Sequence, residues 1–155
     1  MRIAKAALLG FGLITLVALS GPGLAQNQPA AGADKWYSVA TSDNEEAFVN
    51  TSSIKLVGTT VELRAKENYT APKPAVKKDK TYQSARTVYR LDCAQRKIAM
   101  LETRAFSGTE LQGEEVQKAS RSDRNLIWMD APRATVFGEI LDYGCKHAPA
   151  AAPGG

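Results

Sequence analysis

The clearest pattern in this chain is an alternation of apolar and polar residues that begins after Gly58. One set of alternate positions is mostly apolar: Thr59, Val61, Leu63 and Ala65. The other set is polar or charged: Thr60, Glu62, Arg64 and Lys66. A strand with one dry face and one wet face has this period of two. The run up to Val57 is its expected partner, with the turn near Val57-Gly58.

A second alternation extends from Gln83 to Cys93. One face carries Ala85, Thr87, Tyr89, Leu91 and Cys93. The other face carries Arg86, Arg90 and Asp92. The chain is expected to turn at residues 94–96 and to return as a strand over 97–106. Ser107-Gly108 then predicts another hairpin turn, into residues 109–111.

Shorter segments complete the predicted sheet. Residues 35–40 and 47–49 have strand character, and the apolar run 126–129 is expected to be an edge strand or a plug against the core. Trp128 is expected to pack in the core, with an exposed partner site as the alternative. Residues 114–125 are polar and without a period, which predicts a loop that holds a helical turn.

The last element is predicted to be a helix that starts at Asp130-Ala131-Pro132, because proline is favoured at the first helical position. Its apolar stripe consists of Val136, Phe137, Ile140 and Leu141, and Gly144 is expected to stop it. A helix and a sheet that each bury one face predict an α+β domain, with an antiparallel sheet and a C-terminal helix packed on it.

The first 25 residues are typical of a signal peptide. Arg2 and Lys5 precede an apolar run, and Gly23-Leu24-Ala25 offers small residues for cleavage before Gln26. The run is short for a membrane span, so an uncleaved anchor is the less favoured alternative. No cysteine follows the small residues, which predicts no lipid anchor at this site.

Cleavage would leave about 130 residues, the size of one domain. We expect a disordered tether over 26–34, a domain over 35–145 and a disordered tail over 146–155. Without Arg2 and Lys5 the 20 basic residues become 18 against 16 acidic ones, so the net charge falls from +4 to +2. Such a small charge does not favour nucleic acid as a partner.

Cys93 and Cys145 are the only cysteines of the chain. In an exported protein they predict a disulfide, which would tie the helix to the sheet. Free thiols or a metal pair are the alternatives, but the only histidine, His147, lies in the expected tail. The sequence shows no phosphate loop, dinucleotide fingerprint or metal-ligand cluster, so neither a catalytic role nor a cofactor is expected.

Four lysines, Lys73, Lys77, Lys78 and Lys80, fall in the proline-containing segment 71–80, which is expected to be an exposed loop. They are candidate contacts for an anionic partner, such as a sulfated glycan, an acidic protein or lipid headgroups. The alternative is that they only keep a mobile loop soluble.

Over residues 35–145 the chain resembles the surface-adhesin protein E family of exported bacterial proteins. The resemblance is carried by Trp36, the segment Phe48 to Ile54, Leu91-Asp92-Cys93, Pro132 and Gly144-Cys145. It implies an antiparallel sheet with the terminal helix tied to it by the cysteine pair. It also implies a non-enzymatic protein that binds a host surface or matrix protein.

The expected location is therefore outside the inner membrane, in the periplasm or at the cell surface, without a stable span after cleavage. A macromolecular partner, protein or anionic, is expected. Two alternatives stay open: a periplasmic envelope protein with a structural or stress role, and a small inhibitor or accessory subunit.

Overall fold

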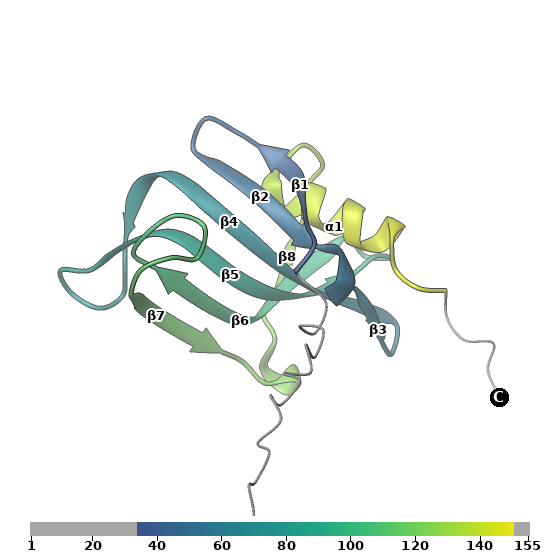
Figure 1. Ribbon diagram of the computed structural model, residues 1–155. Helices are drawn as coiled ribbons and strands as arrows, with labels where there is room; N and C mark the ends of the chain where they lie inside the picture. The colour runs from purple at the N-terminus through teal and green to yellow at the C-terminus, as the bar shows by residue number, and fades with distance from the viewer. Residues whose placement is uncertain (1–33, 151–155) are drawn as a thin grey trace, which may run out of the picture. The chain divides into compact units, whose positions relative to one another are not determined.

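Eight antiparallel strands form one sheet in the computed structural model, which describes residues 34–150 (Figure 1). The predicted signal peptide, all but the last residue of the tether and residues 151–155 lie outside the described residues. The strands are β1 (Trp36–Thr41), β2 (Glu45–Asn50), β3 (Lys55–Val57), β4 (Thr60–Pro74), β5 (Thr81–Asp92), β6 (Lys97–Phe106), β7 (Glu115–Ser120) and β8 (Trp128–Asp130). Two 3-10 turns, η1 (Thr51–Ser53) and η2 (Asp123–Asn125), and the helix α1 (Val136–Lys146) complete the described chain. The predicted α+β class is confirmed.

The sheet runs in the order β1-β2-β4-β5-β6-β7, with β3 beside β4 and β8 beside β6. Both predicted alternations are confirmed in its centre, where Val61 pairs with Leu91 and Leu91 with Ile98. All three residues are buried. The partner strand predicted before Gly58 is β3, whose Val57 pairs with Thr60.

The helix α1 lies across one face of the sheet, at the β1–β2 end, and contacts β1, β2 and β4 most (Figure 1). Ile140 and Leu141 of its apolar stripe are buried against Leu63 and Leu91 of the sheet. The β7 side of the same face lies beyond the helix. Within residues 34–150, no helix combines the length and the apolar character that crossing a membrane requires.

The predicted helix start at Asp130-Ala131-Pro132 is wrong. The helix begins at Val136, and the side chain of Thr135 caps it by accepting a 3.1 Å hydrogen bond from the Gly138 amide. Ala131 instead donates its amide to the Arg96 carbonyl, which keeps this segment attached to the sheet. Pro132 therefore lies in the segment before the helix and not in its first turn, because Thr135, three residues later, is the better cap.

The predicted stop at Gly144 is also wrong, since the helix continues to Lys146. A Cβ atom at this position would lie 2.5 Å from Leu91 Cδ1 and 2.6 Å from Leu63 Cδ2. Gly144 therefore has a packing role, because it lets the helix backbone approach two buried leucines of the sheet.

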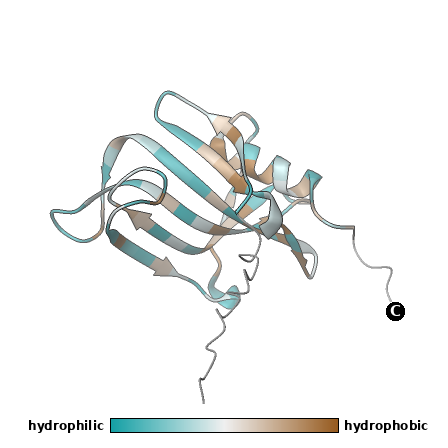
Figure 2. Ribbon diagram, viewed as in Figure 1, coloured by the Kyte–Doolittle hydropathy of each residue, from teal (hydrophilic) through white to brown (hydrophobic). Residues whose placement is uncertain are grey.

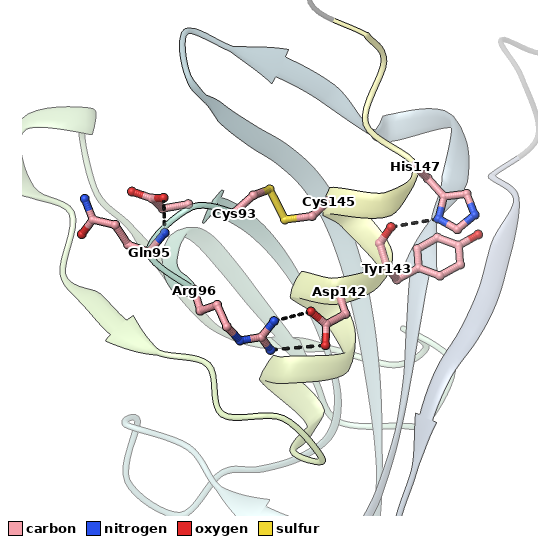
Figure 3. Close-up of a disulfide and its surroundings, with 8 residues drawn as sticks. Cys93, Gln95, Arg96, Asp142, Tyr143, Cys145 and His147 are labelled. Carbon is pink, nitrogen blue, oxygen red and sulfur yellow. Dashed lines mark hydrogen bonds and ion pairs between the residues drawn. A yellow bond between two sulfur atoms is a disulfide. The ribbon is translucent and has the colours of Figure 1, made fainter.

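The predicted disulfide between Cys93 and Cys145 is confirmed, with Cα atoms 5.8 Å apart (Figure 3). Beside it, Arg96 forms an ion pair with Asp142 of the helix, with an Nη1–Oδ1 distance of 2.5 Å. His147, expected in a disordered tail, follows the helix directly and stacks on Tyr143 with ring centroids 4.1 Å apart. A covalent bond and an ion pair thus fasten the C-terminal half of the helix to the turn after β5.

The strand β7 contradicts the loop predicted for residues 114–125, although the expected helical turn exists as η2. The chain returns along β6 only at Glu115, after a loop over residues 107–114, and not at residues 109–111 as predicted. β8 confirms the predicted edge strand, but Ile127 and Trp128 are 56% and 37% exposed. Core packing of Trp128 is therefore wrong, and the alternative of an exposed side chain holds.

Candidate functional site

The face of the sheet opposite α1 has no helix on it among the described residues, and we call it the open face. Four basic residues face one another across it, one from each of β4, β5, β6 and β7. Lys66 pairs with Arg86, Arg86 with Arg104, and Arg104 with Lys118. Directly paired residues of an antiparallel sheet point to the same side, about 5 Å from their neighbours. We call this set the basic row.

Like charges that face each other directly across strands destabilise a sheet. The basic row repeats this arrangement three times in succession, at Lys66–Arg86, Arg86–Arg104 and Arg104–Lys118. Carboxylates offset part of this repulsion, since Glu110 pairs with Lys66 and both Glu102 and Glu115 pair with Arg104. A row of this kind suits the binding of negative groups.

The first residue of the row, Lys66, is covered. Its side chain is only 7% exposed, and its Nζ lies 4.2 Å from the ring centroid of Phe48 and 5.5 Å from that of Trp36. Glu110, from the loop over residues 107–114, binds both Lys66 and Asn68. The hydrogen bond from Lys66 lowers the pKa of Glu110 below its ordinary value. Lys66 therefore serves to hold this loop against the sheet.

The centre of the row is open to a partner. Arg104 binds Glu102 with an Nε–Oε1 distance of 2.6 Å and lies 3.5 Å from Glu115, and its hydrogen bond lowers the pKa of Glu102. Arg86 and Lys118, on either side of Arg104, form no ion pair with any residue in the described part of the chain. Arg86 is half-buried and Lys118 is exposed. These two side chains are the free cations of the row.

A separate ion network lies near the other end of the open face. Arg90 is nearly buried and binds Glu62 and Asp123, both at 3.0 Å. Burial raises the pKa of Glu62, but hydrogen bonds from Lys55 and Arg90 outweigh it, so this pKa lies below its ordinary value. Asp123 comes from η2, so this network fastens the segment after β7 to the sheet. Its charges are already paired.

The four lysines proposed from the sequence do not form one group. Residues 71–74 belong to β4, so the exposed loop is shorter than predicted and spans 75–80. Lys73 lies 3.6 Å from Glu45, and Lys80 lies 2.7 Å from Glu114. Lys77 and Lys78 remain at the turn, in the hydrophilic loop between β4 and β5 (Figure 2). The proposed binding role, which stays a prediction, therefore centres on these two.

Lys66 and Arg86 lie on faces that were predicted to be wet, but Arg104 and Lys118 were not predicted to be their neighbours. Lys118 lies on β7, a strand that was not predicted. Arg104 could have been found by pairing residues outward from the turn at 94–96, but a bulge between Val88 and Tyr89 shifts that register by one. The alignment of the row therefore depends on a β-bulge that could not be predicted from the residue pattern.

Within the described part of the chain, no three His, Cys, Asp or Glu side chains lie where they could hold a metal ion. His147 interacts with Tyr143 through both its ring and its Nδ1 atom, which lies 2.9 Å from the Tyr143 carbonyl oxygen. The open face itself presents the charged side chains of the basic row.

Comparison with known proteins places this geometry in a family. Residues 36–146 match the family model of surface-adhesin protein E. A structure of Haemophilus influenzae protein E is similar at 15% identity, with a TM-score of 0.51, over 72% of this chain and 83% of that one. A selenomethionine form of the same protein matches at 14% identity and a TM-score of 0.47, over 74% and 92% of the two chains.

At such low identity the structural likeness shows the fold alone, and no curated protein matches this sequence. The family model, in contrast, spans all the described strands and the helix. The resemblance noted from Trp36, the segment Phe48 to Ile54 and the two cysteines is thereby confirmed. The chain belongs to the surface-adhesin protein E family.

Proposed function

We propose that this protein is a non-enzymatic, exported adhesin, which binds an anionic macromolecule of the host surface or matrix through the open face of its sheet. The observation that carries the proposal is the basic row, with Arg86 and Lys118 unpaired on either side of Arg104. Family membership supports the adhesin role.

The geometry favours an extended anionic partner over a small one. The paired residues span four adjacent strands, so the row is about 15 Å long at the usual strand spacing. The partner would thus present several negative groups in sequence, as sulfated polysaccharides and acidic protein segments do. Because the net charge of the mature chain is small, local charge and not overall attraction would direct the contact.

The two segments around β7 define the limits of this surface. The loop before β7 reaches back to Lys66 through Glu110, and η2 after β7 reaches back to Arg90 through Asp123. Both segments place a carboxylate near the edge of the open face, and the unpaired cations lie between them along the sheet. This arrangement would centre a negative partner on β5, β6 and β7.

The test compares two double variants with equal loss of charge. Arg86→Gln with Lys118→Gln removes the free cations of the row, and Lys77→Gln with Lys78→Gln removes those of the turn. Both are applied to a heparin column, used here as a sulfated probe, over a salt gradient. We expect the row variant to elute at clearly lower salt than the unmodified protein. We expect the turn variant to change little, because salt screens the turn lysines from a partner bound at the row.

Earlier elution of the turn variant alone would assign binding to the loop over 75–80 and exclude the row. Equal elution of all three proteins would exclude both surfaces. Thermal unfolding of each variant serves as the control for folding, and we expect shifts within about 0.5 kcal/mol for these surface changes.

The location is tested separately. Intact cells that produce the protein are treated with a lysine-reactive label that cannot cross the outer membrane. An adhesin should be labelled on intact cells, and binding to purified matrix proteins should accompany the labelling. Protection from the label until the cells are opened would instead support the periplasmic alternative.

A further inference from the structure

A cavity of about 460 Å³ lies on the other face of the sheet, the one that carries α1. It is bounded by β4, β5, β6 and β7 and by the first turn of the helix, through Val136 and Phe137. Its volume falls in the range of small-molecule sites. None of the four residues of the basic row lines it, and the one shared neighbour is Glu102, which binds Arg104.

The cavity exists because its floor is built of small side chains. On β5, β6 and β7 many of the residues that face it are alanine and threonine: Ala85, Thr87, Thr103, Ala105 and Ala119. Gln117, paired with Ala105, and Met100 and Leu101 also line it. Thr87 and Thr103 join their hydroxyl groups at 3.0 Å, and the Thr103 hydroxyl also lies 3.9 Å from the sulfur of Met100. Small residues on paired strands leave a hollow where larger ones would fill the space up to the helix.

Aromatic rings form the walls. Tyr69 and Tyr82 meet edge to face with centroids 5.6 Å apart, and Tyr89 and Phe137 do so at 6.0 Å. All four rings line the cavity. A cup of rings around a floor of small residues is suited to the flat or aliphatic body of a ligand, and the ring faces attract cations.

One acidic group lies in the interior. Glu67 of β4 is only 5% exposed and accepts hydrogen bonds from the hydroxyl groups of Tyr89, at 2.6 Å, and Tyr69, at 3.2 Å. Its cross-strand neighbours are alanines, Ala47 and Ala85, and no basic residue of the described chain forms an ion pair with it. Burial raises the pKa of Glu67 despite the two hydrogen bonds.

A buried carboxyl group without a countercharge does not stabilise a fold. The other charged side chains of the lining, Glu45, Lys73, Glu102 and Arg121, are at least partly exposed. Each oxygen of Glu67 accepts one of the two tyrosine bonds, whereas a carboxylate can accept about four. Capacity for a further donor therefore remains.

The protein already holds an ammonium group in this manner at the rim. Lys73 Nζ lies 3.7 Å from the ring centroid of Tyr69 and 3.6 Å from Glu45. A ring face and a carboxylate on neighbouring strands thus hold one cation at the rim. Tyr89, Phe137 and Glu67 offer the same combination of groups deeper in the cavity.

We propose that this cavity, called the tyrosine pocket below, binds a ligand with an ammonium or guanidinium group and an apolar body, and that Glu67 is its countercharge. The cationic group would take up the free acceptor positions of Glu67, and the body would lie among the rings over the small-residue floor. This inference goes beyond the proposed adhesin function, since it concerns the opposite face and a different class of ligand.

Two sources could supply such a group: a free amine, or a lysine or arginine side chain of a partner protein. The experiment distinguishes them with 2-phenylethylamine and with the blocked peptide acetyl-Gly-Lys-Gly-amide. The neutral comparison is 2-phenylethanol, which has a similar shape without the charge. Binding to the mature protein is followed by calorimetry and by chemical shifts of the tyrosine rings.

We expect 2-phenylethylamine to bind at least about tenfold more tightly than 2-phenylethanol, the usual gain from one hydrogen bond to a charged group. Glu67→Gln should remove this preference while the protein stays folded. Glu46→Gln makes the same change on the opposite face of the sheet and should leave the preference intact. Ala119→Phe, at an exposed position of the lining, should fill the pocket and weaken binding without loss of thermal stability.

Tighter binding of the peptide than of the free amine would assign the pocket to a side chain of a partner protein, and the reverse order to a small molecule. Equal binding of the amine and the alcohol, or an unchanged preference in Glu67→Gln, would overturn the proposal. So would the absence of binding by both cationic probes at millimolar concentration. The row variant with Arg86→Gln and Lys118→Gln should bind 2-phenylethylamine as the unmodified protein does. Failure of the pocket proposal can therefore be told apart from failure of the adhesin proposal.

Discussion

The two halves of the helix-bearing face of the sheet differ although the same strands build them. Under α1, β5 contributes Leu91 and β6 contributes Ile98, both fully buried. Four residues from Leu91 along β5 and seven residues from Ile98 along β6, the inward positions hold Thr87 and Ala105. One half is filled with large aliphatic side chains, and the other forms the floor of the tyrosine pocket.

This difference separates stability from binding within one face. Large side chains and the disulfide lie together at the C-terminal half of the helix, where Gly144 allows close contact. Beyond the first turn of the helix, small side chains and the buried Glu67 replace them. A filled core leaves no room for a ligand, whereas a hollow with a buried carboxyl group gives up stability to keep that room.

Two changes in the filled half should have the largest effects, and the first is the loss of its disulfide. Replacing Cys93 and Cys145 together by alanine should lower the free energy of unfolding by about 4 kcal/mol at most, given a closed loop of 52 residues. The helix would lose its covalent tie, while the sheet keeps its own dry face. Chemical denaturation of the protein without residues 1–25 measures the loss, and titratable thiols in the native protein would contradict the pairing itself.

The next prediction compares one residue of β5 in the filled half with one in the hollow half. Leu91→Ala should destabilise the protein by about 2–5 kcal/mol, because it leaves a cavity beneath the helix. Thr87→Ala is equally buried but borders an existing hollow, so it should cost only about 1 kcal/mol, mainly for the hydrogen bond with Thr103. Equal losses in urea unfolding would show that both halves are packed alike.

The third effect is a dependence on pH in the hollow half. The pKa of Glu67 is raised above its ordinary value of 4.5 by burial, so the folded state binds this proton more tightly than the unfolded state. The resulting stabilisation is complete below pH 4.5 and is lost as the pH rises through the folded-state pKa. Glu67→Gln should therefore have a higher Tm than the unmodified protein at pH 7.

The difference in Tm should close as the pH falls toward 4, because the unmodified side chain is then neutral as well. Glu46→Gln, on the open face, is the matched control and should not show this convergence. A Tm of Glu67→Gln below that of the unmodified protein at pH 7 would mean that the charged carboxylate stabilises the fold.

The smallest effect is expected outside both halves, in the segment that contains the four lysines. Alanine at Lys73, Lys77, Lys78 and Lys80 together should change the free energy of unfolding little, by about 1 kcal/mol or less. Only Lys73 and Lys80 lose ion pairs, and partly exposed pairs contribute little. A loss as large as that of Leu91→Ala, measured in the same denaturant series, would show that this segment belongs to the core.

Much of the fold could be predicted from the sequence because its evidence is local. The alternation around Val61, Leu63 and Leu91 determined two strands and their dry faces, since strand residues point to opposite sides in turn. Two cysteines after a predicted export signal predicted the disulfide, and the stripe at Ile140 and Leu141 predicted the helix. Local spacing and residue type were sufficient for the existence of these features, although the bounds of the helix were predicted wrongly.

Only the tertiary structure decided what the remaining residues do. Gly144 looked like a helix stop, and its packing against Leu63 and Leu91 appears only when the helix lies on the sheet. β7 has few apolar residues because it is an edge strand, so no apolar alternation predicted this strand. A bulge set the register that brings Arg86 opposite Arg104.

Glu67 shows most clearly what could not be predicted from the sequence. In the sequence it falls on the same alternate positions as Val61, Leu63 and Ala65, but its charge and its polar neighbours Lys66 and Asn68 are typical of an exposed stretch. Its burial, its two tyrosine donors and its lack of a countercharge depend on residues from β2, β4 and β5 that lie far apart in the chain. The sequence determined which residues alternate; the assembled sheet decided which of them face a filled core, a hollow or the solvent, because burial and charge pairing arise from neighbours across strands.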